Sequence, residues 1–345
     1  MSNRNFQDDT KTPIKNGLFQ FGTYNKSFDN INLLEAKKPL GNFSPLFLKK
    51  FKLKEWQAFQ IGNERFFILV AIYNAKFTGV VQFFIYDKIE NKQYFYKIQP
   101  LPINLKVPDK LTNSVAEYKS SNFHIKAEYS AKGEIIVKAS SNNLTKLPNF
   151  EAEFYADLNE NTPQVVCVPF GENRGMYSQK SALKTKGKLK IGNENYEFKQ
   201  ENSFLILDDH KGYYPNPMIY DWCTGAKNDN NKLIAFNLTD NQSIDSEKFN
   251  ENCIWIDKKI HLLPPVKFTR PEGVQKTWII KDKNGMIDIE FTPTVKNEFI
   301  LNFLVIKSDY YGPFGHFKGY IQPENSEKII IDGYFGMGEQ KYIRG

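Results

Sequence analysis

The sequence has little cysteine: Cys167, Cys223 and Cys253 are the only three in 345 residues, and no two form a C-x-x-C pair. Such a sparse, odd-numbered set argues against a disulfide framework and indicates a reducing compartment. The polar N-terminus lacks the apolar core of a signal peptide, and the apolar run at 66–73 is too short to cross a bilayer. We therefore expect a cytoplasmic protein without a transmembrane segment.

Several chemical motifs are also absent. The sequence has no G-x-x-x-x-G-K-[ST] loop, no G-x-G-x-x-G after a predicted strand and no G-x-S-x-G elbow. It has only four histidines, His124, His210, His261 and His316, and no H-E-x-x-H motif. A zinc site would therefore have to be built from residues that are distant in the sequence. We therefore expect neither a nucleotide cofactor nor a metal ion.

Long amphipathic helices are missing as well, because no segment carries an apolar stripe at helical spacing over a dozen residues. Aromatic residues make up 15 % of the chain, and many short strand-like runs are separated by turns, as at 66–73, 80–86, 184–191, 233–238 and 287–291. The apolar run at 299–306 is expected to be one buried strand. These features predict an all-β protein of barrels or sandwiches with few helices.

The chain is long enough for two domains. We expect an N-terminal arm at 1–41, a first β domain at 42–168 and a second at 169–345. The net charge is +7, and its densest basic stretch consists of Lys184, Lys186, Lys188 and Lys190. Period two places these lysines on one face of a strand, which favours a solvated sheet face over a nucleic-acid site.

Residues 207–225, LDDHKGYYPNPMIYDWCTG, combine acids, a histidine, a lysine and aromatic rings with two prolines and two glycines. The composition suggests a shaped loop, and such loops on rigid scaffolds often carry function. The alternative is a well-capped turn with packed tyrosines. Three later clusters have a similar character: Asn250-Glu251-Asn252, Phe314-Gly315-His316-Phe317 and Gly336-Met337-Gly338-Glu339. Each alone is compatible with a purely structural role.

The order of several motifs resembles a known bacterial family. These are Tyr177-Ser178-Gln179-Lys180, Leu207-Asp208, Lys211-Gly212, Tyr214-Pro215, Trp222, Phe236-Asn237, Glu251-Asn252, Phe291-Thr292-Pro293, Phe314-Gly315, Gly319, Glu339 and Arg344. The sequence resembles domain-of-unknown-function family 2804, which is distantly related to carotenoid 1,2-hydratases and AttH-like, lipocalin-like proteins. The resemblance runs from about residue 165 to the end and is fainter before it.

The resemblance implies a pair of packed lipocalin-like antiparallel β-barrels with a site for an apolar ligand. One common form of the family pattern reads Asp-Trp-Gly-Arg-Gly, where this chain has Asp208-Asp209-His210-Lys211-Gly212. Lys211 keeps the charge of the arginine but not its planar fork. The resemblance does not imply a reaction, because similar folds host unrelated functions.

Two functions follow as hypotheses. The first is a hydratase or isomerase acting on a lipid- or isoprenoid-like molecule, with a buried, protonated carboxyl group as proton donor. Its candidate catalytic residues are Asp208, Asp209, His210, Glu251 and Glu339. The candidate ligand-binding residues are Lys211, Tyr213, Tyr214, Trp222, Asn252, Phe314 and His316.

The second hypothesis is a non-catalytic carrier or sensor of a similar apolar small molecule, held inside a barrel. A purely structural interaction module is a third reading, but it leaves the crowding of acids and rings at 207–225 unexplained. The sequence predicts no nucleic-acid partner and leaves the oligomeric state open.

Overall fold

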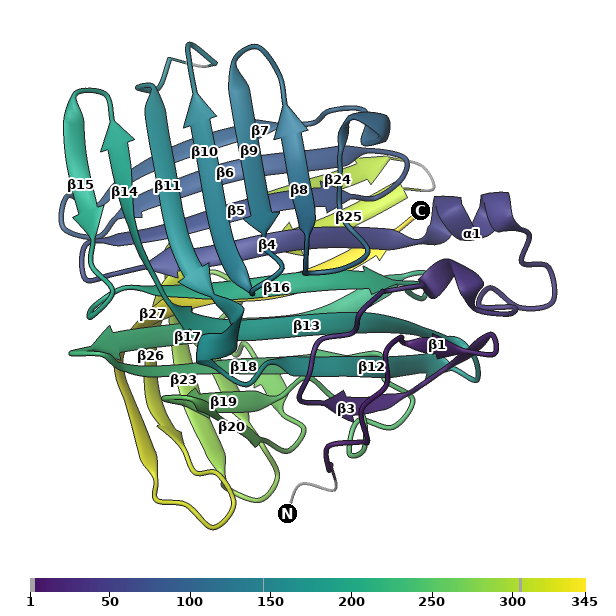
Figure 1. Ribbon diagram of the computed structural model, residues 1–345. Coiled ribbons are helices and arrows are strands. Elements are labelled where there is room, and N and C mark those ends of the chain that lie inside the picture. The colour runs from purple at the N-terminus through teal and green to yellow at the C-terminus, as the bar shows by residue number, and fades with distance from the viewer. Residues whose placement is uncertain (1–3, 145, 304–305) are drawn as a thin grey trace.

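The computed structural model describes residues 4–144, 146–303 and 306–345. Within these residues the chain forms antiparallel sheets with only short helices, which confirms the predicted all-β class. Three sheets stack as layers, and the strands of the upper sheet in Figure 1 cross those of the middle one steeply. No helix in the described ranges has the length and apolar character needed to span a bilayer.

The middle layer is an eight-stranded sheet. Its strands, in spatial order, are β3 (Gly22–Tyr24), β12 (Gln164–Gly171), β13 (Arg174–Lys184), β16 (Phe204–Gly212), β4 (Lys54–Gly62), β5 (Phe66–Asn74), β6 (Gly79–Asp87) and β7 (Lys92–Ile98). In β5, Phe66, Ile68 and Val70 belong to one apolar core, and Phe67 and Leu69 belong to another. The run at 66–73 is continuously apolar because both faces of its strand are buried.

A six-stranded sheet covers one face of the middle layer (Figure 1). Its strands are β15 (Glu194–Phe198), β14 (Lys186–Ile191), β11 (Phe150–Asp157), β10 (Glu134–Ser141), β9 (Phe123–Tyr129) and β8 (Ser114–Lys119). Between the two sheets, Phe83 stacks on Phe150 with ring centroids 4.3 Å apart, and Tyr96 packs against the same ring at 4.5 Å. Lys186, Lys188 and Lys190 are exposed on β14, as the alternation predicted, whereas Lys184, expected on the same strand, ends β13 and is half-buried.

The third layer covers the other face of the middle sheet. Its main path is β20 (Lys259–Leu262), β19 (Cys253–Ile256), β18 (Lys232–Asn241), β17 (Met218–Asp229), β27 (Ile329–Arg344), β26 (Phe314–Ile321), β23 (Ile287–Val295), β22 (Trp278–Lys281) and β21 (Lys267–Thr269). A hairpin of β24 (Glu298–Phe303) and β25 (Ile306–Tyr311) joins it through β27. The layer curls around a core of its own, in which Trp278 packs against Phe291. Phe67 and Phe314 join it to the middle sheet.

The N-terminal arm packs against the middle sheet and is anchored by buried Ile14, Phe28 and Leu33. It contains β1 (Ile14–Lys15), β2 (Leu18–Phe19) and the 3-10 turn η1 (Leu33–Glu35), and its strand β3 joins β12. The remaining helical pieces are α1 (Leu46–Lys52), η2 (Pro102–Asn104) and η3 (Leu158–Glu160). The expected boundary at residue 168 lies inside β12, and strands from both sides of it share the middle sheet.

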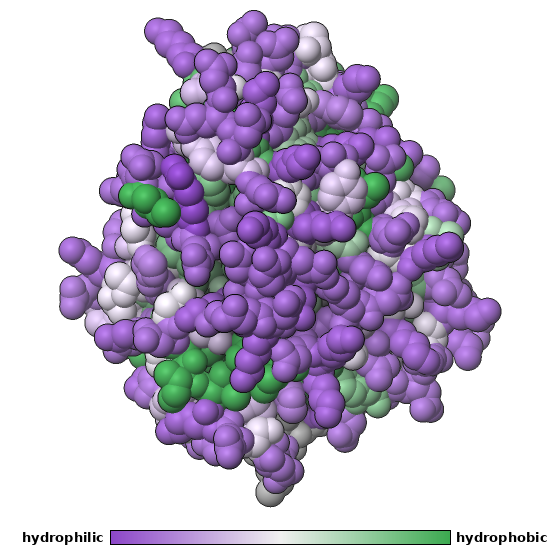
Figure 2. Space-filling model, turned by 60° about the vertical axis from the view of Figure 1, so that its left-hand side comes forward, coloured by the Kyte–Doolittle hydropathy of each residue, from purple (hydrophilic) through white to green (hydrophobic). Residues whose placement is uncertain are grey.

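Two local predictions were wrong. Residues 207–225 are not a loop, because most of them belong to β16 and β17, joined by a short connection with a cis Asn216–Pro217 bond. The run at 299–306 is not one buried strand: it is divided between β24 and β25, and Ile300 is 53 % exposed. Residues 304–305 of that run lie outside the described residues. On the face in Figure 2, hydrophilic side chains predominate, and apolar ones gather in a few separate areas.

The close approach of β17 to β27 requires a glycine at residue 336. A Cβ atom there would lie 2.0 Å from the carbonyl oxygen of Thr224, a backbone atom that moves only with its strand. We expect Gly336→Ala to lower the free energy of unfolding by about 1–3 kcal/mol, measured by urea denaturation. At Gly171 the nearest atom to a Cβ would be 3.6 Å away, so Gly171→Ala is the control, and an equal loss in both variants would contradict this explanation.

Candidate functional site

Strands β13 and β16 lie side by side in the middle sheet, and their alternation decides which polar residues meet. Ser178 pairs with His210 and Lys180 with Asp208, which places these four side chains on the face toward the third layer. Gln179 and Asp209 also pair, but they point to the opposite face, toward the six-stranded sheet. The strands therefore divide the acids of 208–209 between two separate environments.

A buried ammonium group organises the first environment. Lys180 Nζ lies 2.9 Å from Asp208 Oδ1, 2.9 Å from Glu251 Oε1 and 3.0 Å from Ser178 Oγ. His210 Nε2 lies 2.7 Å from the same nitrogen and 2.9 Å from Asp208 Oδ1. Glu251 comes from the third layer, so this cluster joins two layers. We call Ser178, Lys180, Asp208, His210 and Glu251 the Lys180 cluster.

The electrostatics of the cluster favour charged carboxylates. Burial opposes ionisation of Asp208, but the charges of Lys180 and His210 outweigh it and lower the pKa of Asp208. The pKa of Glu251 is lowered in the same way, with burial opposed by Lys180 and His210. Burial also acts against the charge of Lys180, yet its two carboxylate partners raise its pKa. Asp208 and Glu251 are thus ionised near neutral pH.

A chain of hydrogen-bonding groups leads out of the cluster. His210 Nδ1 lies 3.2 Å from the hydroxyl of Tyr214, and the indole of Trp56 stacks on the imidazole with centroids 4.4 Å apart. Trp56 Nε1 also points to Asp208 Oδ2 at 3.4 Å. Burial, followed by the charges of Glu251 and Asp208, raises the pKa of Tyr214, so its phenol stays protonated.

The imidazole can carry its proton on either nitrogen. With the proton on Nε2, it donates to Asp208, and Nδ1 accepts from the Tyr214 hydroxyl. With the proton on Nδ1, it donates to Tyr214, and Nε2 accepts from Lys180. In either state the imidazole connects the Tyr214 hydroxyl to the Lys180 cluster through hydrogen bonds.

Aromatic rings surround a second buried lysine beside Trp56. Lys341 Nζ lies 4.9 Å from the ring centroid of Tyr220, 5.4 Å from that of Tyr310 and 5.5 Å from those of both Trp56 and Tyr73. These four rings, which we call the aromatic cage, are all partly exposed. Glu339 is on the same face of β27, and burial followed by the charge of Glu339 raises the pKa values of Tyr220 and Tyr310.

The opposite face of β16 holds another set of predicted site residues. The side chain of Asp209 is fully buried, and burial raises its pKa to about 6 although Lys211, Gln57 and Tyr177 act against the shift. Lys211 binds Glu55 at 2.9 Å and Asp109 at 2.8 Å. Tyr213 is buried in the core under the N-terminal arm. These three predicted residues therefore do not share a site with Asp208.

The other predicted residues have mainly packing roles. Trp222 donates to Asn237 Oδ1 at 2.6 Å, and Asn237 in turn binds the backbone carbonyl of Glu251. Asn252 accepts a hydrogen bond from the Thr239 backbone and fixes the same segment. Two residues lie apart from the cluster: Phe314 packs on Phe67 and Phe84, and exposed His316 packs on Phe335.

Sequence reasoning missed Ser178, Lys180, Lys341 and the four rings of the aromatic cage as site candidates. A signal for Ser178 and Lys180 was present, because both belong to the motif Tyr177-Ser178-Gln179-Lys180 that contributes to the family resemblance. Lys341 has no such signal, since Lys341 and Arg344 near the end of the chain resemble ordinary surface charges. In the part of the chain that the structure describes, no group of three or more His, Cys, Asp or Glu residues could hold a metal ion.

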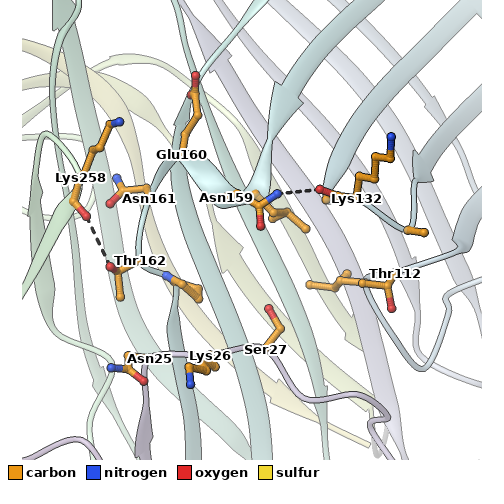
Figure 3. A pocket seen from close by; sticks show the side chains of 15 residues that line it. Asn25, Lys26, Ser27, Thr112, Lys132, Asn159, Glu160, Asn161, Thr162 and Lys258 are labelled. Carbon is orange, nitrogen blue, oxygen red and sulfur yellow. Dashed lines mark hydrogen bonds between the residues drawn. The ribbon is translucent and has the colours of Figure 1, made fainter.

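Two hollows open on the described surface near η3. The first, of about 540 Å³, is lined by polar side chains from the arm, the β9–β10 turn and the segment at 158–163, with Lys132 and Lys258 among them (Figure 3). The second, of about 710 Å³, shares Glu160, Asn161 and Lys258 with the first. Neither includes a residue of the Lys180 cluster or the aromatic cage. Neither of these two hollows is therefore the apolar ligand site that was expected beside Asp208 and Glu251.

The curled, stacked antiparallel sheets define a lipocalin-like β protein. The chain belongs to the family described as domain of unknown function (DUF2804), whose model matches residues 14–344. This confirms the resemblance noted from the sequence.

Two solved structures of low sequence identity align with the chain. Kievitone hydratase from Nectria haematococca aligns with a TM-score of 0.50 and 12 % identity, over 84 % of this chain and 88 % of that one. An AttH-like protein from Nitrosomonas europaea aligns with a TM-score of 0.49 and 12 % identity, over 85 % and 93 % of the two chains. No curated protein matches the chain.

Proposed function

We propose that this protein is an acid–base enzyme that adds water to, or shifts, a carbon–carbon double bond of a largely apolar small molecule. The observation that carries the proposal is the hydrogen-bonded series Tyr214–His210–Asp208, which connects a partly exposed phenol to a buried ionic cluster. The neighbouring aromatic cage offers ring faces against which an apolar ligand can stack. The shared fold of a hydratase is compatible with this chemistry but shows the fold alone.

In this proposal Tyr214 donates its proton to one carbon of the double bond, and His210 returns a proton to Tyr214. The imidazole recovers its proton from the water that bonds to the other carbon or, when the double bond shifts, from the proton that leaves the ligand. The raised pKa of Tyr214 keeps its hydroxyl protonated until a reacting carbon accepts the proton. Asp208 remains charged and holds the imidazole in place, so it does not act as the protonated carboxyl donor that the sequence suggested. Ser178 and Lys180 fix the other side of the ring.

Deuterium transfer tests the proposal. The purified protein is incubated in deuterated water with the lipid extract of the cells that produce it, and mass spectrometry follows compounds that gain deuterium or a water molecule. We expect His210→Asn and Tyr214→Phe each to slow this gain at least about tenfold, because each breaks the relay. His316→Asn is the matched control, since His316 lies apart from the cluster. Transfer at the wild-type rate in His210→Asn contradicts the assignment.

The alternative is a non-catalytic carrier or sensor of a lipid-like ligand. One observation favours it: the charges of the Lys180 cluster satisfy one another, as they do in a purely structural network. Native mass spectrometry separates the two functions. A carrier releases its co-purified ligand chemically unchanged after long incubation, whereas the proposed enzyme converts it.

A further inference from the structure

The aromatic cage contains a buried cation without a partner of opposite charge. Lys341 is only 8 % exposed. Its one hydrogen bond to the described residues goes from Nζ to the Tyr220 hydroxyl at 2.7 Å. An ammonium group has three N–H donors, so two remain without a hydrogen bond to the described residues. No described carboxylate lies within ion-pair distance of it, which distinguishes Lys341 from Lys180 and Lys211.

Buried charges in folded proteins are ordinarily paired or coordinated, because an isolated one is expensive to remove from water. Burial lowers the pKa of Lys341, and the charges of Glu339 and Asp208 act against this shift without forming an ion pair. The ring faces of the cage stabilise the ammonium group only in part, since each contributes about 0.5–2 kcal/mol. The remaining donors therefore favour an oxygen supplied from outside the chain.

We propose that Lys341 binds an anionic head group, such as a carboxylate, of a ligand whose apolar body stacks on the aromatic cage. The inference rests on the proposed function, because it treats the cage and Tyr214 as parts of one site beside Trp56. The substrate class is then an unsaturated apolar molecule with an acidic group. The cage rings then bind the apolar body of the ligand rather than stabilise a cationic intermediate, because the ammonium group of Lys341 already lies at their centre.

Two fluorescent probes test this inference without knowledge of the natural ligand. 1-Anilinonaphthalene-8-sulfonate carries one anionic group, and N-phenyl-1-naphthylamine has the same rings without it. Energy transfer from tryptophan reports their binding, and Trp56 is the partly exposed member of four tryptophans, since Trp222, Trp255 and Trp278 are buried. We expect Lys341→Gln to raise the Kd of the anionic probe at least about tenfold and to change the Kd of the neutral probe by no more than about twofold.

Two further variants make the outcome decisive. Lys341→Arg keeps the charge and should retain most of the binding of the anionic probe. Lys328→Gln is the matched control, because Lys328 lies 3.7 Å from the ring of Tyr320, outside the cage. The probes report binding without turnover, so wild-type protein that binds the anionic probe but gains no deuterium in any compound separates failure of the proposed function from failure here. Failure of the anionic probe to bind, unchanged affinity in Lys341→Gln, or equal loss of both probes overturns the inference.

Discussion

Replacing Lys180 with methionine is expected to lower the free energy of unfolding by about 3–5 kcal/mol, because two buried carboxylates lose their shared ammonium partner. Asp208 and Glu251 both lie 2.9 Å from Lys180 Nζ, and their side chains are 11 % and 3 % exposed. The methionine fills a similar volume, so the loss reports charge rather than a cavity. Urea denaturation at neutral pH measures it.

The explanation has a specific control. The triple variant Lys180→Met, Asp208→Asn, Glu251→Gln removes all three charges together and should recover most of the lost stability. Lys188→Met, on the exposed face of β14, should change stability by no more than about 0.5 kcal/mol. If the triple variant is as unstable as Lys180→Met, the stability lost in Lys180→Met comes from altered packing and not from uncompensated charge.

Asp209→Asn is expected to stabilise the protein at neutral pH, by up to about 3 kcal/mol. Burial raises the pKa of this carboxyl from its ordinary value of 3.8 to about 6 in the folded protein, a difference that corresponds to about 3 kcal/mol against the charged form. Burial is the main cause, and neither carboxylate oxygen has a hydrogen bond of normal geometry to a described residue. An amide removes this cost while remaining close in shape.

The pH dependence follows from the sign of the shift. Between about pH 4 and 6 the folded protein binds the Asp209 proton and the unfolded chain does not, so this group makes stability fall as pH rises through that window. The Asn variant should lack this fall. Asp208→Asn is the contrasting variant: the pKa of Asp208 is lowered, so its charge stabilises the fold and its removal should destabilise it at neutral pH. A stabilised Asp208→Asn or a destabilised Asp209→Asn would contradict the assigned environments.

The sequence predicted the fold class because strand patterns are local. Alternation at 287–291 and the apolar run at 66–73 are both readable without tertiary information, and both are strands in the structure. Prolines and glycines at 207–225 misled the interpretation, because only the short connection between β16 and β17 uses the prolines as a turn. Composition alone did not show that the flanking residues continue as strands.

The candidate site was only partly predictable, for a geometric reason. Asp208 and His210 meet Glu251 as expected, but adjacent Asp209 and Lys211 point through the other face of the same sheet. A two-residue period separates these pairs only once the segment is known to be a strand with both faces buried. Lys341 had no sequence signal, because its burial depends on rings from four other strands.

The pairing of β16 with β4 joins residues about 150 positions apart, as in the contact of Asp208 with Ala58. During synthesis, β4 to β7 therefore emerge from the ribosome long before the strand that completes their sheet. Until residue 212 is available, β4 presents an unpaired hydrogen-bonding edge, a known template for intermolecular association. Chaperone dependence during translation, rather than instability of the finished molecule, is the vulnerability that this connectivity creates.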